Sequence, residues 1–245
     1  MSIAYVDGIA NYAATSPLQL VIPSDVPVGG VLCVYGSVFA NAVTISLSGT
    51  VNAPVQMYYG YNGVNDSYLA WAIEVGAGDP GATLTFTEDG ADTYIAGIIL
   101  GYSGAGMPPA NTGGANQGYA YANGGFSNTP ATTWTAPALA AGAPVAGCWG
   151  VGLITAGVGS GDGSATYGGW TSRPSNPASG ANSADSNGPV GGQGSAIGGG
   201  TWTTTADGEN VGITLALPPP AAPASGGPPR GDYESRALVR RPWLW

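Results

Sequence analysis

Glycine and proline are spread so densely along this chain that no long helix can form. The sequence of 245 residues contains 43 glycines and 20 prolines, and one or the other interrupts almost every apolar stretch. Glycine weakens a helix interior and proline breaks it. No long window keeps apolar residues at the three- and four-residue spacing of an amphipathic helix. The chain must therefore build its core from strands.

Short runs of β-branched and aromatic residues supply those strands, and turns such as Asp79-Pro80-Gly81 separate them. The expected strands cover residues 18–22, 31–38, 43–47, 55–59, 68–75, 83–87, 94–102, 132–135, 145–154, 165–170, 194–197, 201–205 and 211–217. With no helices between them, they predict an all-β fold. We expect an antiparallel two-sheet sandwich, jelly-roll-like, as one body over residues 1–217.

The two halves of this body share a weak pattern. A glycine-flanked hydrophobic segment contains Cys33 in the first half and Cys148 in the second. Each half then ends with a Thr-rich strand, 83–87 or 201–205, followed by an apolar closing strand. Two interpretations stay open, an internal duplication and a chance repetition of β patterns. The pattern does not decide whether the two cysteines lie close together.

The composition changes abruptly after Leu217. Residues 218–229 form a Pro-rich spacer that cannot join a sheet. Residues 230–245 then combine guanidinium groups with aromatic and aliphatic side chains, the types enriched at protein interfaces. We expect this extended C-terminal arm to dock on a neighbouring subunit, and a disordered tail is the alternative. The expected partner-binding residues are Arg236, Leu238, Val239, Arg240, Arg241, Trp243, Leu244 and Trp245.

The charged residues exclude several classes of function. The chain has no histidine and its five basic residues are all arginine, which excludes a Ser-His-Asp triad, an imidazole metal site, a Schiff base and a P-loop lysine. Residues 1–229 hold twelve acids and one base, Arg173, so this acidic body repels nucleic acid. We expect no cofactor, no metal site and no nucleic-acid partner.

Location follows from equally simple features. The uncharged stretch 136–161 is rich in Ala and Gly and contains two prolines, so membrane insertion is not expected. The first residues lack the basic and apolar regions of a secretory signal, and two cysteines do not make a disulfide framework. We expect synthesis and retention in a cytoplasm.

Carboxylates and tyrosines supply the remaining candidate sites. A polysaccharide hydrolase would need two facing carboxyl groups, for which Glu74 and Glu88 are candidates, but Glu88 sits beside a turn and is expected to be solvated. Stacking aromatic side chains hold sugars in many β-sandwich modules. The candidate glycan-binding residues are Tyr58, Tyr59, Tyr61, Tyr119 and Tyr121, and core filling is the competing interpretation because the chain has only three Phe.

Several segments resemble a group of known proteins. They are residues 27–32 (PVGGVL), 81–86 (GATLTF), 95–104 (IAGIILGYSG), 132–139 and 170–174 (WTSRP). The pattern is similar to β-sandwich virion proteins of tailed bacteriophages, especially those of high-GC actinobacterial hosts. That resemblance implies a minor tail or capsid-surface protein with no enzymatic motif. The Pro-rich spacer and the Arg/Trp arm depart from the simplest members.

Together these features predict a non-enzymatic structural protein of a virion, made in the host cytoplasm. Its expected partners are neighbouring virion proteins and further copies of itself, as a homo-oligomer. The alternative is a carbohydrate-binding adhesin that contacts a glycan of the host cell surface.

Overall fold

The fold is antiparallel and all-β, as the sequence predicts. The computed structural model describes residues 2–39, 44–61, 66–90, 94–108, 121–123, 133–135, 147–158, 165–176, 181–190, 201–204 and 209–221. Within these ranges the chain forms sixteen strands and no helix. A membrane-spanning helix, long and apolar, is accordingly not found among the described residues.

The first half of the chain is a two-sheet sandwich with jelly-roll winding. One sheet holds five strands in the order β1 (Ala4–Ala13), β8 (Ile95–Ser103), β3 (Val31–Phe39), β6 (Asp66–Glu74) and β5 (Val55–Tyr61). The other sheet holds β2 (Leu18–Val21), β7 (Thr83–Glu88) and β4 (Ile45–Ser48). The first strand pairs with the last, and the chain crosses repeatedly between the two sheets, which is how a jelly roll closes.

The second half repeats this winding strand for strand. Its five-stranded sheet has the order β13 (Thr171–Asn176), β14 (Ala181–Pro189), β11 (Trp149–Val158), β16 (Glu209–Leu217) and β9 (Tyr121–Asn123). Its three-stranded sheet has the order β10 (Thr133–Thr135), β15 (Thr201–Thr204) and β12 (Ala165–Gly168). Adding eight to each strand number of the first half reproduces both orders. The weak sequence pattern therefore reflects an internal duplication of the fold.

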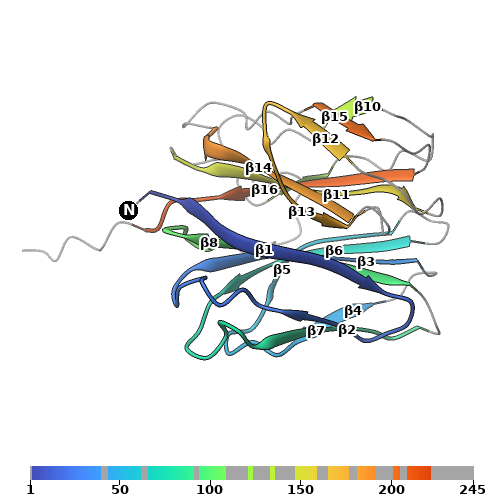
Figure 1. The fold of residues 1–245 in the computed structure, drawn as a ribbon, viewed down its shortest axis with the longest axis horizontal. Coiled ribbons are helices and arrows are strands. Elements are labelled where there is room, and N and C mark those ends of the chain that lie inside the picture. The colour runs from blue at the N-terminus through green and yellow to red at the C-terminus, as the bar shows by residue number, and fades with distance from the viewer. Residues whose placement is uncertain are drawn as a thin grey trace, which may run out of the picture.

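The two jelly rolls stack through their five-stranded sheets. Figure 1 shows four layers, with β2, β4 and β7 at the bottom and β10, β12 and β15 at the top. Between the two inner layers lies a continuous apolar cluster, the seam core, to which the first half contributes Tyr35, Ile98 and Leu100 and the second half Leu153 and Leu215. The central strands β3 and β8 are thus buried on both faces, which explains their uninterrupted apolar runs.

Strand alternation divides the side chains between two cores. On β3, Cys33 and Tyr35 point into the seam core, whereas Leu32 and Val34 pack inside the first jelly roll. A Cβ atom on Gly97 would lie 3.0 Å from both Leu18 and Phe86, so glycine lets the three-stranded sheet approach β8 closely.

The structure departs from the expected strands at several places. The strands β1, β9, β13 and β14 were not expected. The sequences of β13 and β14 are rich in Asn, Ser and Pro, which hides them from a search for apolar runs. The expected strand at 194–197 lies outside the described residues. Cys33 and Cys148 are both buried, belong to different apolar clusters and are not joined by a disulfide.

The last strand ends at Leu217, where the sequence places the end of the body. The next residues pass along the segment that follows β8, and the amide of Gly106 donates a hydrogen bond to the carbonyl oxygen of Pro218 at 2.8 Å. The spacer beyond residue 221 and the arm at 230–245 lie outside the described residues.

Candidate functional site

The most elaborate polar cluster in the described chain lies where the two jelly rolls meet. Arg173 on β13, the single base of the acidic body, pairs with Asp185 on the neighbouring strand β14. Its Nε donates to Oδ2 at 2.8 Å and its Nη2 to Oδ1 at 2.9 Å, a bidentate geometry. The Asp185 side chain has no exposed surface, and that of Arg173 is 13% exposed.

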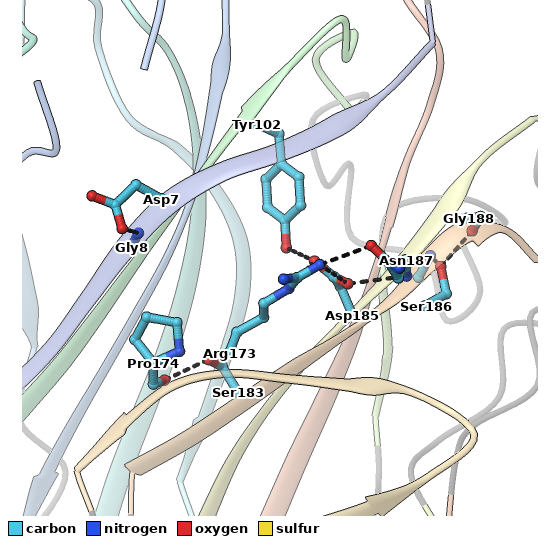
Figure 2. A network of polar contacts seen from close by, with 11 residues as sticks. Asp7, Gly8, Tyr102, Arg173, Pro174, Ser183, Asp185, Ser186, Asn187 and Gly188 are labelled. Carbon is cyan, nitrogen blue, oxygen red and sulfur yellow. Dashed lines mark hydrogen bonds and ion pairs between the residues drawn. The ribbon is translucent and has the colours of Figure 1, made fainter. Parts of the chain in front are cut away.

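This ion pair also contacts the first half of the chain. The Tyr102 hydroxyl on β8 donates to Oδ2 of Asp185 at 3.0 Å, and Figure 2 shows the ring aimed directly at the carboxylate. The Arg173 guanidinium lies 3.9 Å from the centre of the Tyr5 ring on β1, a cation–π contact. The Tyr102 ring meets Tyr5 and Trp149 edge-on. The network therefore joins β1 and β8 to β11, β13 and β14.

Asn187 completes the shell around the carboxylate. The backbone N–H of Asn187 donates to Oδ1 of Asp185 at 3.0 Å, and its side-chain Oδ1 accepts from Nη2 of Arg173 at 3.1 Å. Its backbone is left-handed, with φ of 48°, a conformation that asparagine tolerates better than most residues. Asp185 thus accepts hydrogen bonds from two guanidinium nitrogens, a hydroxyl and an amide. A carboxylate so enclosed and so saturated holds structure together and is not placed to transfer protons to a solute.

The same packing shifts the titration of the neighbouring groups. Burial raises the pKa of Tyr5 to about 12, with the charge of Asp7 adding to the effect. Burial and the adjacent Asp185 raise the pKa of Tyr102 well above its usual range, and burial also raises that of the Cys33 thiol. For Arg173 burial opposes the charge, but hydrogen bonding to Asp185 prevails and raises its pKa.

These shifts predict a loss of stability in alkali. Below pH 10 the hydroxyls of Tyr5 and Tyr102 are protonated in both the folded and the unfolded chain, so their contribution to the free energy of unfolding is fully present. Above pH 10 the unfolded chain loses protons that folded Tyr5 retains up to about pH 12, and the free energy of unfolding falls across that window. We expect Tyr5→Phe to reduce the steepness of this fall in urea titrations between pH 9 and about pH 12. Equal slopes in the two proteins would contradict the assignment.

The structure corrects the tyrosine prediction. Tyr58 is only 5% exposed and its ring belongs to the seam core, so its assignment as a glycan-binding residue is wrong. Tyr59 follows it on β5, points the other way and is 45% exposed. Nothing is described for the side chains of Tyr61 and Tyr121, and Tyr119 lies outside the described residues, so their part in the prediction stays untested.

A different tyrosine pair is exposed, and sequence reasoning missed it. Tyr12 on β1 stacks on Tyr94, with ring centres 5.0 Å apart and planes inclined by 27°. Tyr12 is 40% exposed. Beside it, Oδ1 of Asn11 accepts a hydrogen bond of 3.5 Å from Nδ2 of Asn176 on the second jelly roll. No pattern marks the pair, because the two rings lie 82 positions apart and only the β1–β8 pairing brings them together.

The other described carboxylates differ in exposure and in their partners. Glu74, the last residue of β6, is exposed. Glu88, the last residue of β7, is buried, contrary to expectation. Buried Asp79 accepts the amides of Val51 and Gly76, each at 2.7 Å. Asp89 accepts the amide of Thr44 at 2.7 Å. Among the described residues, no three or more acids, histidines or cysteines converge as metal ligands would.

The eight arm residues expected to bind a partner all lie outside the described part of the chain, so that prediction stays open. Comparison with known proteins adds no candidate function, since no protein-family model, no curated protein and no solved structure matches the chain.

Proposed function

We propose that this protein is a non-enzymatic structural component of a tailed-bacteriophage particle, at the tail or another surface position. Its duplicated jelly-roll body attaches through the arm at residues 230–245. The observation that supports this proposal most is the enclosed Arg173–Asp185–Tyr102 network. Its buried ion pair joins one jelly roll to the other, so this buried charge has a structural role.

The architecture suits a building block. Jelly rolls are common in viral capsid and lectin domains, an argument by fold analogy alone. Two stacked jelly rolls with a shared seam core form a rigid unit whose working surfaces lie outside, on loops and turns. The resemblance found in the sequence points in the same direction. The tethered arm then raises the local concentration of binding groups near a neighbour.

The test is incorporation into particles. Cultures that produce the protein are fractionated on a density gradient, and the chain is quantified by mass spectrometry in the particle band. We expect the full chain in that band, and a variant lacking residues 230–245 folded but left in the free fraction. Asp232→Ala with Glu234→Ala is the matched control, since it keeps every Arg and Trp of the arm. Absence of the full chain from particles, or normal incorporation of the truncated chain, would overturn the proposal.

One observation favours a second candidate, a glycan-binding adhesin. The exposed ring of Tyr12, stacked on Tyr94, offers the kind of apolar face on which a sugar ring can stack. On this candidate, Tyr12→Ala abolishes binding to an array of immobilised oligosaccharides. Tyr59→Ala, which removes a similarly exposed ring on β5, leaves binding unchanged. An unmodified protein that binds no oligosaccharide of the array would eliminate the candidate.

A further inference from the structure

The first jelly roll carries an apolar and acidic surface at the end where β1 begins. It is formed by the turns before β3, after β4 and after β6. Val28 and Val51 are the most exposed large apolar residues described, at 62% and 64%. Asp25 and Glu74 are exposed at the same end. We call these four residues, with the turns that present them, the turn surface.

Hydrogen bonds hold the turn surface in a fixed shape. The amide of Gly29 donates to the carbonyl oxygen of Val75 at 2.8 Å, which ties the Val28 turn to the end of β6. Buried Asp79 ties the Val51 turn to the same segment through the amides of Val51 and Gly76. A Cβ atom on Gly76 would lie 2.7 Å from Cβ of Val51, so Val51 rests directly on this glycine. The two exposed valines therefore sit on a preformed support, which lowers the entropic cost of binding.

The charge of the turn surface calls for a basic partner. Nδ2 of Asn52 donates to the carbonyl oxygen of Glu74 at 2.9 Å, which places Glu74 beside the Val51 turn. The only base in residues 1–229, Arg173, is committed to Asp185. The remaining four arginines of the chain are in residues 230–245, interspersed with Trp, Leu and Val. The arm thus carries guanidinium groups that complement the acids of the turn surface, and apolar side chains that complement its valines.

The chain also leaves the body at this end. The carbonyl oxygen of Pro218 accepts a hydrogen bond from the amide of Gly106, three residues beyond the end of β8. This end of β8 lies beside the Val28 turn, because Tyr102 on β8 pairs with Val31 at the start of β3. Residues 222–229 would span about 25 Å as an extended polyproline segment. Because the exit and the turn surface share one end, two copies that face each other can exchange arms reciprocally in a closed, two-fold arrangement.

We propose that the turn surface of one copy binds the arm, residues 230–245, of a second copy. Val28 and Val51 receive the tryptophan and leucine side chains, and Asp25 and Glu74 face the arginines. The inference rests on the docking arm of the proposed function and adds the site and the partner.

The experiment uses the full chain and measures its dimer dissociation constant by analytical ultracentrifugation at about 0.1 M salt. We expect a dimer that Val28→Asp weakens at least about tenfold. Val21→Asp is the matched control, because Val21 is 53% exposed on β2 and lies outside the turn surface. A monomeric unmodified chain, or equal effects of the two substitutions, would overturn the inference.

A charge exchange identifies the arm as the partner. Asp25→Arg with Glu74→Arg should weaken the dimer about tenfold, and so should Arg240→Glu with Arg241→Glu. Combining all four should recover most of the affinity, and failure to recover would refute the pairing. The outcome is separable from the proposed function. A chain that enters particles through its arm but shows no charge rescue keeps the function and loses this site.

Discussion

Asp185→Ala lowers the free energy of unfolding by about 3–5 kcal/mol, the usual cost of removing one partner from a buried ion pair. The substitution leaves the guanidinium of Arg173, whose side chain is 13% exposed, without its counter-charge. It also removes the acceptor of the Tyr102 hydroxyl and of the Asn187 amide. Urea denaturation followed by circular dichroism measures the change.

Two further variants show whether the loss comes from the unpaired charge. The double substitution Arg173→Met with Asp185→Leu should cost much less than Asp185→Ala, because apolar replacement of both partners leaves no buried charge. Asp25→Ala, at an exposed position, should stay within about 0.5 kcal/mol of the unmodified protein. An Asp185→Ala variant that is equally close to the unmodified protein would show that the network contributes nothing to stability.

Residues 1–108, produced without the second half, do not remain a soluble monomer. The separated jelly roll would expose the seam face of its five-stranded sheet, including Val31, Tyr35, Ile98 and Leu100. Contiguous apolar surface of this kind drives self-association or precipitation. Size-exclusion chromatography with light scattering distinguishes monomer from aggregate.

Neighbouring positions on β8 provide the matched control for this fragment. Leu100→Ser lies on the seam face and should raise the soluble fraction of residues 1–108, whereas Ile99→Ser lies in the core of the first jelly roll and should unfold it. A fragment that is monomeric and unfolds cooperatively without any substitution would show that the two halves are independent units.

The sequence was informative where local pattern alone selects the structure. The closing strands β8 and β16, each preceded by a Thr-rich strand, were predictable from apolar runs and turn residues, and they carried the signal of the duplication. It was uninformative for β13 and β14, whose Ser, Asn and Pro residues have low strand propensity. Polar side-chain contacts between the two strands support them instead: the Arg173–Asp185 ion pair, and the hydrogen bond from the Ser183 hydroxyl to the carbonyl oxygen of Pro174.

The candidate tyrosines illustrate the same limit. Alternation along β5 predicts that Tyr58 and Tyr59 face opposite ways, but it cannot say which face meets solvent. The answer depends on the second jelly roll, which covers the Tyr58 side. The Tyr12–Tyr94 pair is equally hidden in the sequence, because its members belong to opposite ends of the first half.

Fusion of two like domains in one polypeptide releases them from the symmetry that binds a pair of identical subunits. In such a pair every surface residue occurs twice, on both sides of the axis. Here β13 corresponds by strand order to β5, yet β13 contributes Arg173 while β5 contributes Met57 and Tyr58 to the same interface. The interface is therefore ionic at the β13 edge and apolar at the β5 edge. Each jelly roll can therefore carry its own binding residues on its outer surface, independently of the other jelly roll.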